Sequence, residues 1–95
     1  MLFRSALKQI GGEAAAHADL VVTGSRVVVV WKEFDGERTH LRAMVSDNGG
    51  DSWRDSTLAM TEAASDQPRA LLIGNRVTAF WNTQREGRRV LEIAP

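Results

Sequence analysis

The sequence predicts an all-β fold made of antiparallel, four-stranded sheets. Three observations carry this prediction: a repeat with an offset of 50 residues, a two-residue turn signal in each copy, and a glycine-rich corner in the first copy. Residues 18–45, ADLVVTGSRVVVVWKEFDGERTHLRAMV, align without a gap with residues 68–95, PRALLIGNRVTAFWNTQREGRRVLEIAP. The identical pairs are Gly24/Gly74, Arg26/Arg76, Val27/Val77, Trp31/Trp81, Arg38/Arg88 and Leu41/Leu91.

Each copy begins with the pattern of a β-hairpin. Residues 20–23 and 70–73 form short apolar runs, and a Gly-Ser or Gly-Asn pair follows each run as a two-residue turn. A second run, at 27–34 and 77–81, is rich in β-branched and aromatic residues, which favour strands. A further turn, FDGE in the first copy and REGR in the second, then leads to a third strand.

The third segment of the first copy alternates as a strand does, with two sets of residues on opposite faces. These sets are Leu41, Ala43 and Val45 on one face, and His40, Arg42 and Met44 on the other. A fourth strand, SWRDSTL, follows the glycine-rich corner, and residues 3–8 are expected to form the matching strand of a preceding unit. Apolar residues on both faces indicate sheets covered on both sides, which is typical of propeller blades. The alternative is a short helical turn within residues 5–20, whose alanines favour helix.

The corner SDNGGDSW, residues 46–53, resembles the Asp-box of the BNR-repeat β-propellers, the family that includes bacterial and viral sialidases. The family pattern is Ser or Thr, any residue, Asp, any residue, Gly, any residue, Thr or Ser, then Trp. Ser46, Gly50, Ser52 and Trp53 fit this pattern, and Asn48 stands where Asp is usual. The resemblance implies a structural corner between the third and fourth strands, away from the substrate and anchored by Trp53.

The resemblance also implies a division of the chain into parts of a single propeller region, residues 1–95. We expect the end of a preceding blade at 1–10, a complete blade with the Asp-box at 18–58, and a partial last blade at 68–95. The chain is therefore expected to be a C-terminal fragment of a longer protein. Residues 2–5, Leu-Phe-Arg-Ser, also match the translation of the end of a common sequencing adapter, so one hypothesis is a foreign start. The alternative is a native segment, since Phe3 corresponds to Trp53 at the repeat offset.

Composition narrows the classes of partner. Twelve basic and twelve acidic residues balance, so no charge field favours nucleic acid. The chain has no cysteine, which excludes thiolate metal sites, and no cofactor is expected. The longest apolar run, residues 27–31, is too short to span a membrane. The first twelve residues lack the apolar region of a signal peptide, so the compartment is left open, with an exported or periplasmic parent as the expectation.

Sialidases, by resemblance, use a tyrosine nucleophile, and this chain has no tyrosine. We therefore expect a scaffold piece of an exo-sialidase-like glycoside hydrolase, inactive alone, whose partners are the remaining blades and whose parent binds sialic acid or another glycan. One alternative is a lectin-like, two-blade module that forms a closed propeller as a homo-oligomer. Another is a non-enzymatic BNR protein that serves as an interaction platform.

Several residues are weaker candidates for a site. Asp66, Gln67 and Arg69 lead into an innermost strand, where propellers present ligand-facing residues, and Arg69 could pair with a carboxylate. A surface arginine is the plainer interpretation. Glu33, Asp35 and Glu37 alternate as paired carboxylates for acid/base chemistry would, but a solvated hairpin tip is the preferred interpretation. His17 and Asp19 have the spacing of two metal ligands without an evident third.

Overall fold

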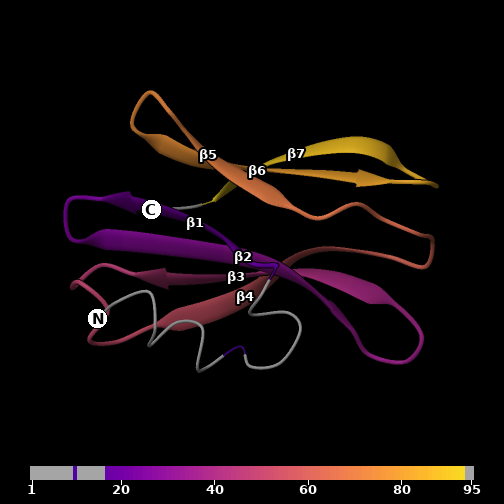
Figure 1. Ribbon diagram of the computed structural model, residues 1–95, viewed down its shortest axis with the longest axis horizontal. Helices are drawn as coiled ribbons and strands as arrows, with labels where there is room; N and C mark the ends of the chain where they lie inside the picture. The colour runs from indigo at the N-terminus through magenta and orange to yellow at the C-terminus, as the bar shows by residue number, and fades with distance from the viewer. Residues whose placement is uncertain (1–9, 11–16, 94–95) are drawn as a thin grey trace.

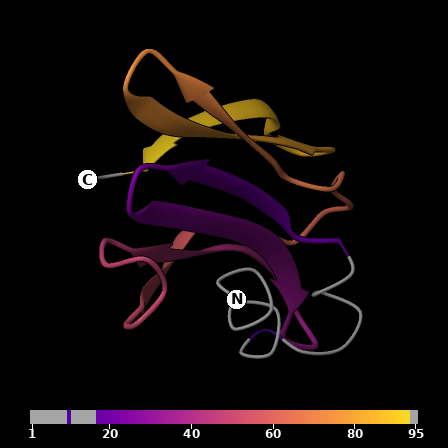
Figure 2. The ribbon, with the colours of Figure 1, turned by 60° about the vertical axis from the view of Figure 1, so that its left-hand side comes forward.

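The described residues, Ile10 and 17–93, form two antiparallel β-sheets in the computed structural model, which confirms the all-β prediction. The first sheet contains, in chain order, β1 (Asp19–Thr23), β2 (Arg26–Phe34), β3 (Thr39–Ser46) and β4 (Arg54–Thr61). The second contains β5 (Arg69–Ile73), β6 (Arg76–Thr83) and β7 (Gly87–Ile93). The second sheet lies over one face of the first (Figure 1), and the turned view shows the same two layers (Figure 2).

Two-residue turns join the first two strands of each sheet, as the sequence predicts. Thr23 pairs with Arg26 across the first turn, and β5 and β6 close in the same way. Gly24 and Gly74 have φ of 59° and 66°, and no non-glycine residue among those described has a positive φ. A positive φ at the first turn position alone is the pattern of the type II′ turn, which matches the right-handed twist of the strands.

The main hydrophobic core lies between the two sheets. Alternate residues of β2, β3 and β4 meet alternate residues of β5, β6 and β7, so each sheet contributes one apolar face. The buried members are Val28, Val30, Leu41, Ala43, Val45, Ala59, Ala70, Val77, Ala79, Trp81 and Ile93. The predicted alternation of the third strand is therefore correct, since its three apolar residues all face this core and Met44 faces the other way.

A second apolar cluster covers the opposite face of the first sheet. Its buried members come from β2 and β3, and Trp53 and Ile10 pack against them. The buried members are Val27, Val29, Trp31 and Met44. The first sheet is thus apolar on both faces, as the sequence predicts.

The two sheets are stacked in the same sense. The strand pair β1–β2 has the same register as β5–β6 at the 50-residue repeat offset. Val22 pairs with Val27 in the first sheet, and Leu72 pairs with Val77 in the second. Residues 27, 29 and 31 face away from the second sheet, whereas the corresponding residues 77, 79 and 81 face toward the first. The second sheet therefore repeats the orientation of the first instead of meeting it face to face.

The gapless alignment is wrong in the third strand. Val27 pairs with Ser46 in the first sheet, and Val77 pairs with Ile93 in the second, so the offset there is 47 residues. The hairpin formed by β6 and β7 is three residues shorter than the hairpin formed by β2 and β3, and its connection, residues 84–86, is one residue shorter than residues 35–38. The identities at positions 38/88 and 41/91 are thus coincidences of composition, whereas the other four lie in strands or turns that correspond structurally.

Parts of the prediction lie outside the described residues. The strand expected at 3–8 and most of the helical alternative at 5–20 belong to this group, although Asp19 and Leu20 form the start of β1. Within the described part of the chain, no helix is long and apolar enough to cross a membrane.

Candidate functional site

The candidate site is a pocket of about 570 Å³ on the outer face of the second sheet, at the end where the 62–68 connection enters β5. Two of its residues come from that connection, and the others come from each of the three strands. The lining residues are Asp66, Gln67, Arg69, Phe80, Asn82 and Arg88. The structure thus brings together the three residues that the sequence singles out here.

Strand register aligns the pocket residues across the sheet. Arg69 pairs with Phe80, and Asn82 pairs with Arg88, so these side chains form two cross-strand pairs on one face. Phe80 and Asn82 are two apart in β6 and therefore point to the same side of the sheet. The result is a row with an aromatic ring, an amide and two guanidinium groups.

Backbone and side-chain hydrogen bonds hold Asp66 beside β6. Its amide donates to the carbonyl of Asn82 at 2.9 Å, and its own carbonyl accepts the indole N–H of Trp81 at 3.0 Å. The Asn82 amide group also donates to Asp66 Oδ2 at 3.4 Å. Because Trp81 is a core residue, the 62–68 connection is tied directly to the packing between the sheets.

Arg69 pairs with a carboxylate, but one that belongs to the chain itself. Its Nε lies 3.5 Å from Oδ2 of Asp19, and the same oxygen accepts the amide of Ala70 at 2.7 Å. Asp19 therefore links β1 of the first sheet to β5 of the second. The Arg69 side chain remains 72% exposed, so most of its donors face solvent and are open to a ligand.

The metal hypothesis gains no support from this geometry. Asp19 already accepts two donors, and the exposed His17 precedes β1 by two residues. No group of three or more His, Asp or Glu side chains suited to a metal ion occurs among the described residues.

The carboxylates near the β2–β3 turn stabilise the hairpin. Asp35 Oδ1 accepts the amides of Glu37 and Arg38 at 2.8 Å each, and Oδ2 lies 2.7 Å from Nε2 of His40. The Arg38 amide first, and then the His40 ring and the Glu37 amide, hold the pKa of the Asp35 carboxyl well below its usual range. Glu33, at 3.5 Å, accepts the indole N–H of Trp31. These groups are exposed and their geometry is that of a capped turn.

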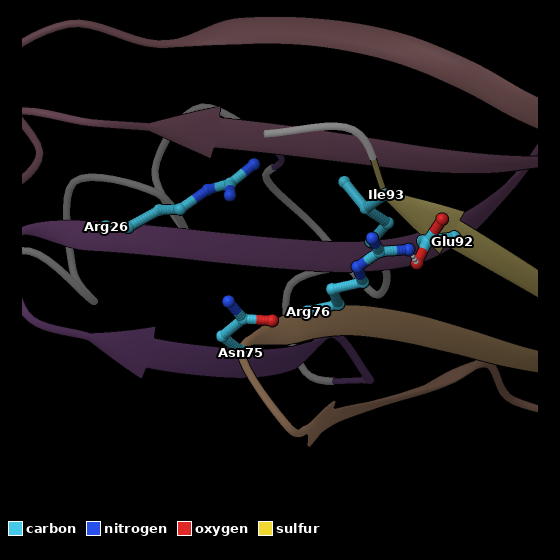
Figure 3. A pocket seen from close by; sticks show the side chains of 5 residues that line it. All are labelled: Arg26, Asn75, Arg76, Glu92 and Ile93. Carbon is cyan, nitrogen blue, oxygen red and sulfur yellow. Dashed lines mark hydrogen bonds and ion pairs between the residues drawn. The ribbon is translucent and has the colours of Figure 1, made fainter.

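A second pocket, of about 400 Å³, lies at the opposite end of the strands, beside the β5–β6 turn. Figure 3 shows Arg26 from β2 and Arg76 from β6 at this pocket, with Glu92 beside Arg76. Arg76 donates to Glu92 at 2.7 Å, which raises the pKa of the guanidinium, and Arg26 Nε lies 3.5 Å from Asp47. Carboxylates of the chain thus offset both charges, which favours a structural role over anion binding.

The corner at residues 46–53 is held by a compact set of hydrogen bonds centred on two side chains. The Ser46 hydroxyl accepts the Gly50 amide at 2.8 Å and donates to Asn48 Oδ1 at 2.9 Å. The Asn48 oxygen also accepts the Ser52 amide at 3.0 Å, and its nitrogen donates to the Ser52 hydroxyl at 2.8 Å. Gly50 has φ of 99°, so a larger residue would be strained there. The Trp53 indole donates to the Gly50 carbonyl at 3.0 Å.

Ser46→Ala is expected to destabilise the chain by about 1–3 kcal/mol, because it leaves the partly buried amides of Asn48 and Gly50 without the hydroxyl that accepts them. Ser46 is 1% exposed, whereas Ser52 is exposed. Ser52→Ala is the matched control and is expected to cost less, about 0.5–1 kcal/mol. Urea unfolding followed by far-ultraviolet circular dichroism measures both. Equal costs for the two variants would contradict the central role of Ser46.

Sequence reasoning missed Phe80, Asn82 and Arg88 as pocket residues. Phe80 and Asn82 could have been found from their two-residue spacing, which places both side chains on one face of a strand. The turn at residues 74–75 marks the start of that strand. Arg88 required the correct register of β7, which the gapless repeat displaced by three residues.

Compared with protein-family models, curated proteins and solved structures, the chain has no match.

Proposed function

We propose that the chain supplies two consecutive blades of a sialidase-like β-propeller, as a structural part of an exo-acting glycoside hydrolase. The supporting observation is the same-sense stacking of the sheets, in which residues 77–81 face the first sheet although residues 27–31 face away from it. Blades around a propeller axis repeat in this way, whereas the two sheets of a simple sandwich meet through like faces.

The corner geometry adds support to the proposal. The family pattern places a hydroxyl, an acceptor and a tryptophan at fixed spacing, and here Ser46, Asn48 and Trp53 bond to each other or to the turn backbone. Asn48 retains the acceptor oxygen of the usual aspartate. In this proposal the corner is scaffold, and ligand contacts come from the pocket at the other end of the strands.

The isolated chain is expected to show no turnover of an aryl sialoside, because it has no tyrosine to serve as nucleophile. Any glycan binding is expected to be no tighter than millimolar, about −4 kcal/mol, since two blades supply only part of a propeller pocket. Fluorogenic hydrolysis and titration calorimetry measure the two quantities. Turnover by the purified 95-residue chain would contradict the proposal.

A longer protein that contains this chain together with upstream blades is the positive control. It is expected to hydrolyse the sialoside, and removal of its upstream blades is expected to abolish activity, because groups that act as a unit lose most of their catalysis together. A folded longer protein that neither hydrolyses nor binds sialosides would overturn the glycosidase assignment. It would not contradict the proposed blade architecture.

A lectin-like module is the second candidate, and the outer face of the second sheet favours it. Leu71 and Ile73 are 50% and 54% exposed there, on the same face as the pocket with its arginines and Phe80. An apolar face of this kind is suited to stacking by the first sheet of another copy. Micromolar glycan binding, at a stoichiometry that matches a closed oligomer, would select this candidate over the scaffold.

A further inference from the structure

The outer edge of β7 is the most open strand edge of the second sheet. β7 pairs with β6 from Val77↔Ile93 to Thr83↔Gly87 without a register shift, and no described strand pairs with its other side. Its N–H and C=O groups on that side therefore offer a straight template for another strand. β5, the other edge strand, contacts β1 of the first sheet.

The corresponding free edge of the first sheet is protected in a way that β7 is not. The register of β3 with β4 shifts between Leu41 and Arg42, where Leu58 is skipped, which indicates a bulge in β4. Bulges twist an edge and discourage further pairing. β7 has no such irregularity and contains neither lysine nor proline.

We propose that β7 pairs antiparallel with β7 of a second copy of this chain, across a twofold axis centred on Val90. The two three-stranded sheets then form one continuous six-stranded sheet. In this register Arg88 of each copy lies opposite Glu92 of the other, and the two Val90 side chains face each other.

Charge selects this register among the neighbouring ones. Arg88, Val90 and Glu92 lie on the outer face of the second sheet, since they pair with Asn82, Phe80 and Thr78 of β6. A twofold axis perpendicular to the sheet keeps the outer faces on one side, so an outer-face residue of one copy can oppose only an outer-face residue of the other. Opposite charges directly across a strand pair stabilise it, and like charges destabilise it.

Shifts of the centre in either direction lose the favourable pairs. A centre at Arg89 sets the two copies of Arg89 against each other, and a centre at Arg88 or at Glu92 sets like charges opposite one another. A centre at Leu91 sets Glu92 opposite Val90 and forms no opposite-charge pair. Only the centre at Val90 gives two opposite-charge pairs.

The local environment leaves these side chains able to pair. Arg88 is exposed and forms no ion pair within the described part of the chain. Glu92 accepts Arg76 through Oε1, which leaves Oε2 for a second guanidinium (Figure 3). Val90 is 56% exposed and would be covered by its counterpart.

Sedimentation equilibrium at low salt tests the proposal with charge variants. The wild-type chain is expected to be a dimer, and Arg88→Glu is expected to raise the dimer Kd about tenfold or more, because two attractive pairs become repulsive. The double variant Arg88→Glu/Glu92→Arg restores opposite charges and is expected to recover most of the affinity. Arg85→Glu, in the exposed β6–β7 turn, is the matched control and should leave the Kd unchanged.

A cross-linking experiment tests the centre of the interface directly, since the chain has no cysteine of its own. Val90→Cys is expected to form a disulfide-linked dimer when diamide is added, because opposed residues in antiparallel strands lie within disulfide reach. Val22→Cys is the control, since Val22 has a similar exposure of 52% and lies in β1.

The results separate this proposal from the propeller function. A monomer at all concentrations, a closed trimer, equal cross-linking of the two cysteine variants, or failure of the double charge variant would each overturn β7 pairing. None of these results bears on sialoside hydrolysis by the longer protein, so the two proposals fail independently.

Discussion

Replacement of Trp81 by alanine is expected to lower the free energy of unfolding by about 3–5 kcal/mol, the range for removing a large aromatic side chain from a core. Trp81 is 1% exposed and lies between the two sheets. Its indole N–H also donates to the carbonyl of Asp66, so the substitution removes an anchor of the 62–68 connection. Urea unfolding at a fixed protein concentration, followed by circular dichroism, measures the loss.

Trp81→Phe separates packing from hydrogen bonding. It keeps most of the ring and loses the bond to Asp66, so a smaller cost of about 1–2 kcal/mol is expected. Amide exchange of Asp66 should rise in both variants, since the connection loses its tie to the core. If Trp81→Ala has the same urea midpoint as the wild-type chain, the result would contradict the packing of the two sheets around Trp81.

The sequence allowed the strands and turns to be predicted because their signals are local. Gly24 and Gly74 mark turns that need positive φ, and the alternation at residues 41–45 defines one buried face. The same alternation does not exist in β2, where Val27–Val30 are all buried, because both faces of the first sheet are covered. A continuous apolar run therefore predicted the two-sided burial but not which residue faces which core.

The gapless alignment of the two copies is wrong at the third strand because the length of a hairpin determines the register of its strands. A hairpin that is three residues shorter moves every residue of β7 against β6, and an odd shift also exchanges the faces. Leu91 thus lies opposite Ala79, whereas Leu41 lies opposite Lys32. Two accidental identities concealed this change in a comparison made from sequence alone.

Contacts between distant residues were beyond the reach of sequence patterns. Asp19 accepts the amide of Ala70, and the Lys32 ammonium donates to the carbonyl of Ser65 at 2.8 Å. Both contacts join the first sheet to the chain that follows it, and both depend on how the sheets stack. The candidate pocket was therefore only partly predictable: Asp66 and Arg69 follow from their place at the entry to β5, whereas Arg88 depends on the register of β7.

Trp53→Ala is expected to lower the free energy of unfolding by about 2–4 kcal/mol, less than the Trp81 change because Trp53 is only partly buried. Its ring packs against the cluster formed by Val27, Val29, Trp31 and Met44, and its indole N–H closes the corner on Gly50. The substitution therefore removes apolar contact and a turn bond together. Urea unfolding at a fixed protein concentration measures the loss.

Trp53→Phe is the informative comparison, because phenylalanine keeps an aromatic ring on the cluster and cannot donate to Gly50. If Trp53 acts mainly by packing, Trp53→Phe should recover more than half of the stability lost in Trp53→Ala, since a single hydrogen bond contributes about 0.5–1.5 kcal/mol. If the corner depends mainly on the indole bond, both variants should lose similar stability, and the amides of Gly50 and Ser52 should exchange faster in both. A Trp53→Ala chain as stable as wild type would contradict any anchoring role, because the corner would then be held by Ser46 and Asn48 alone.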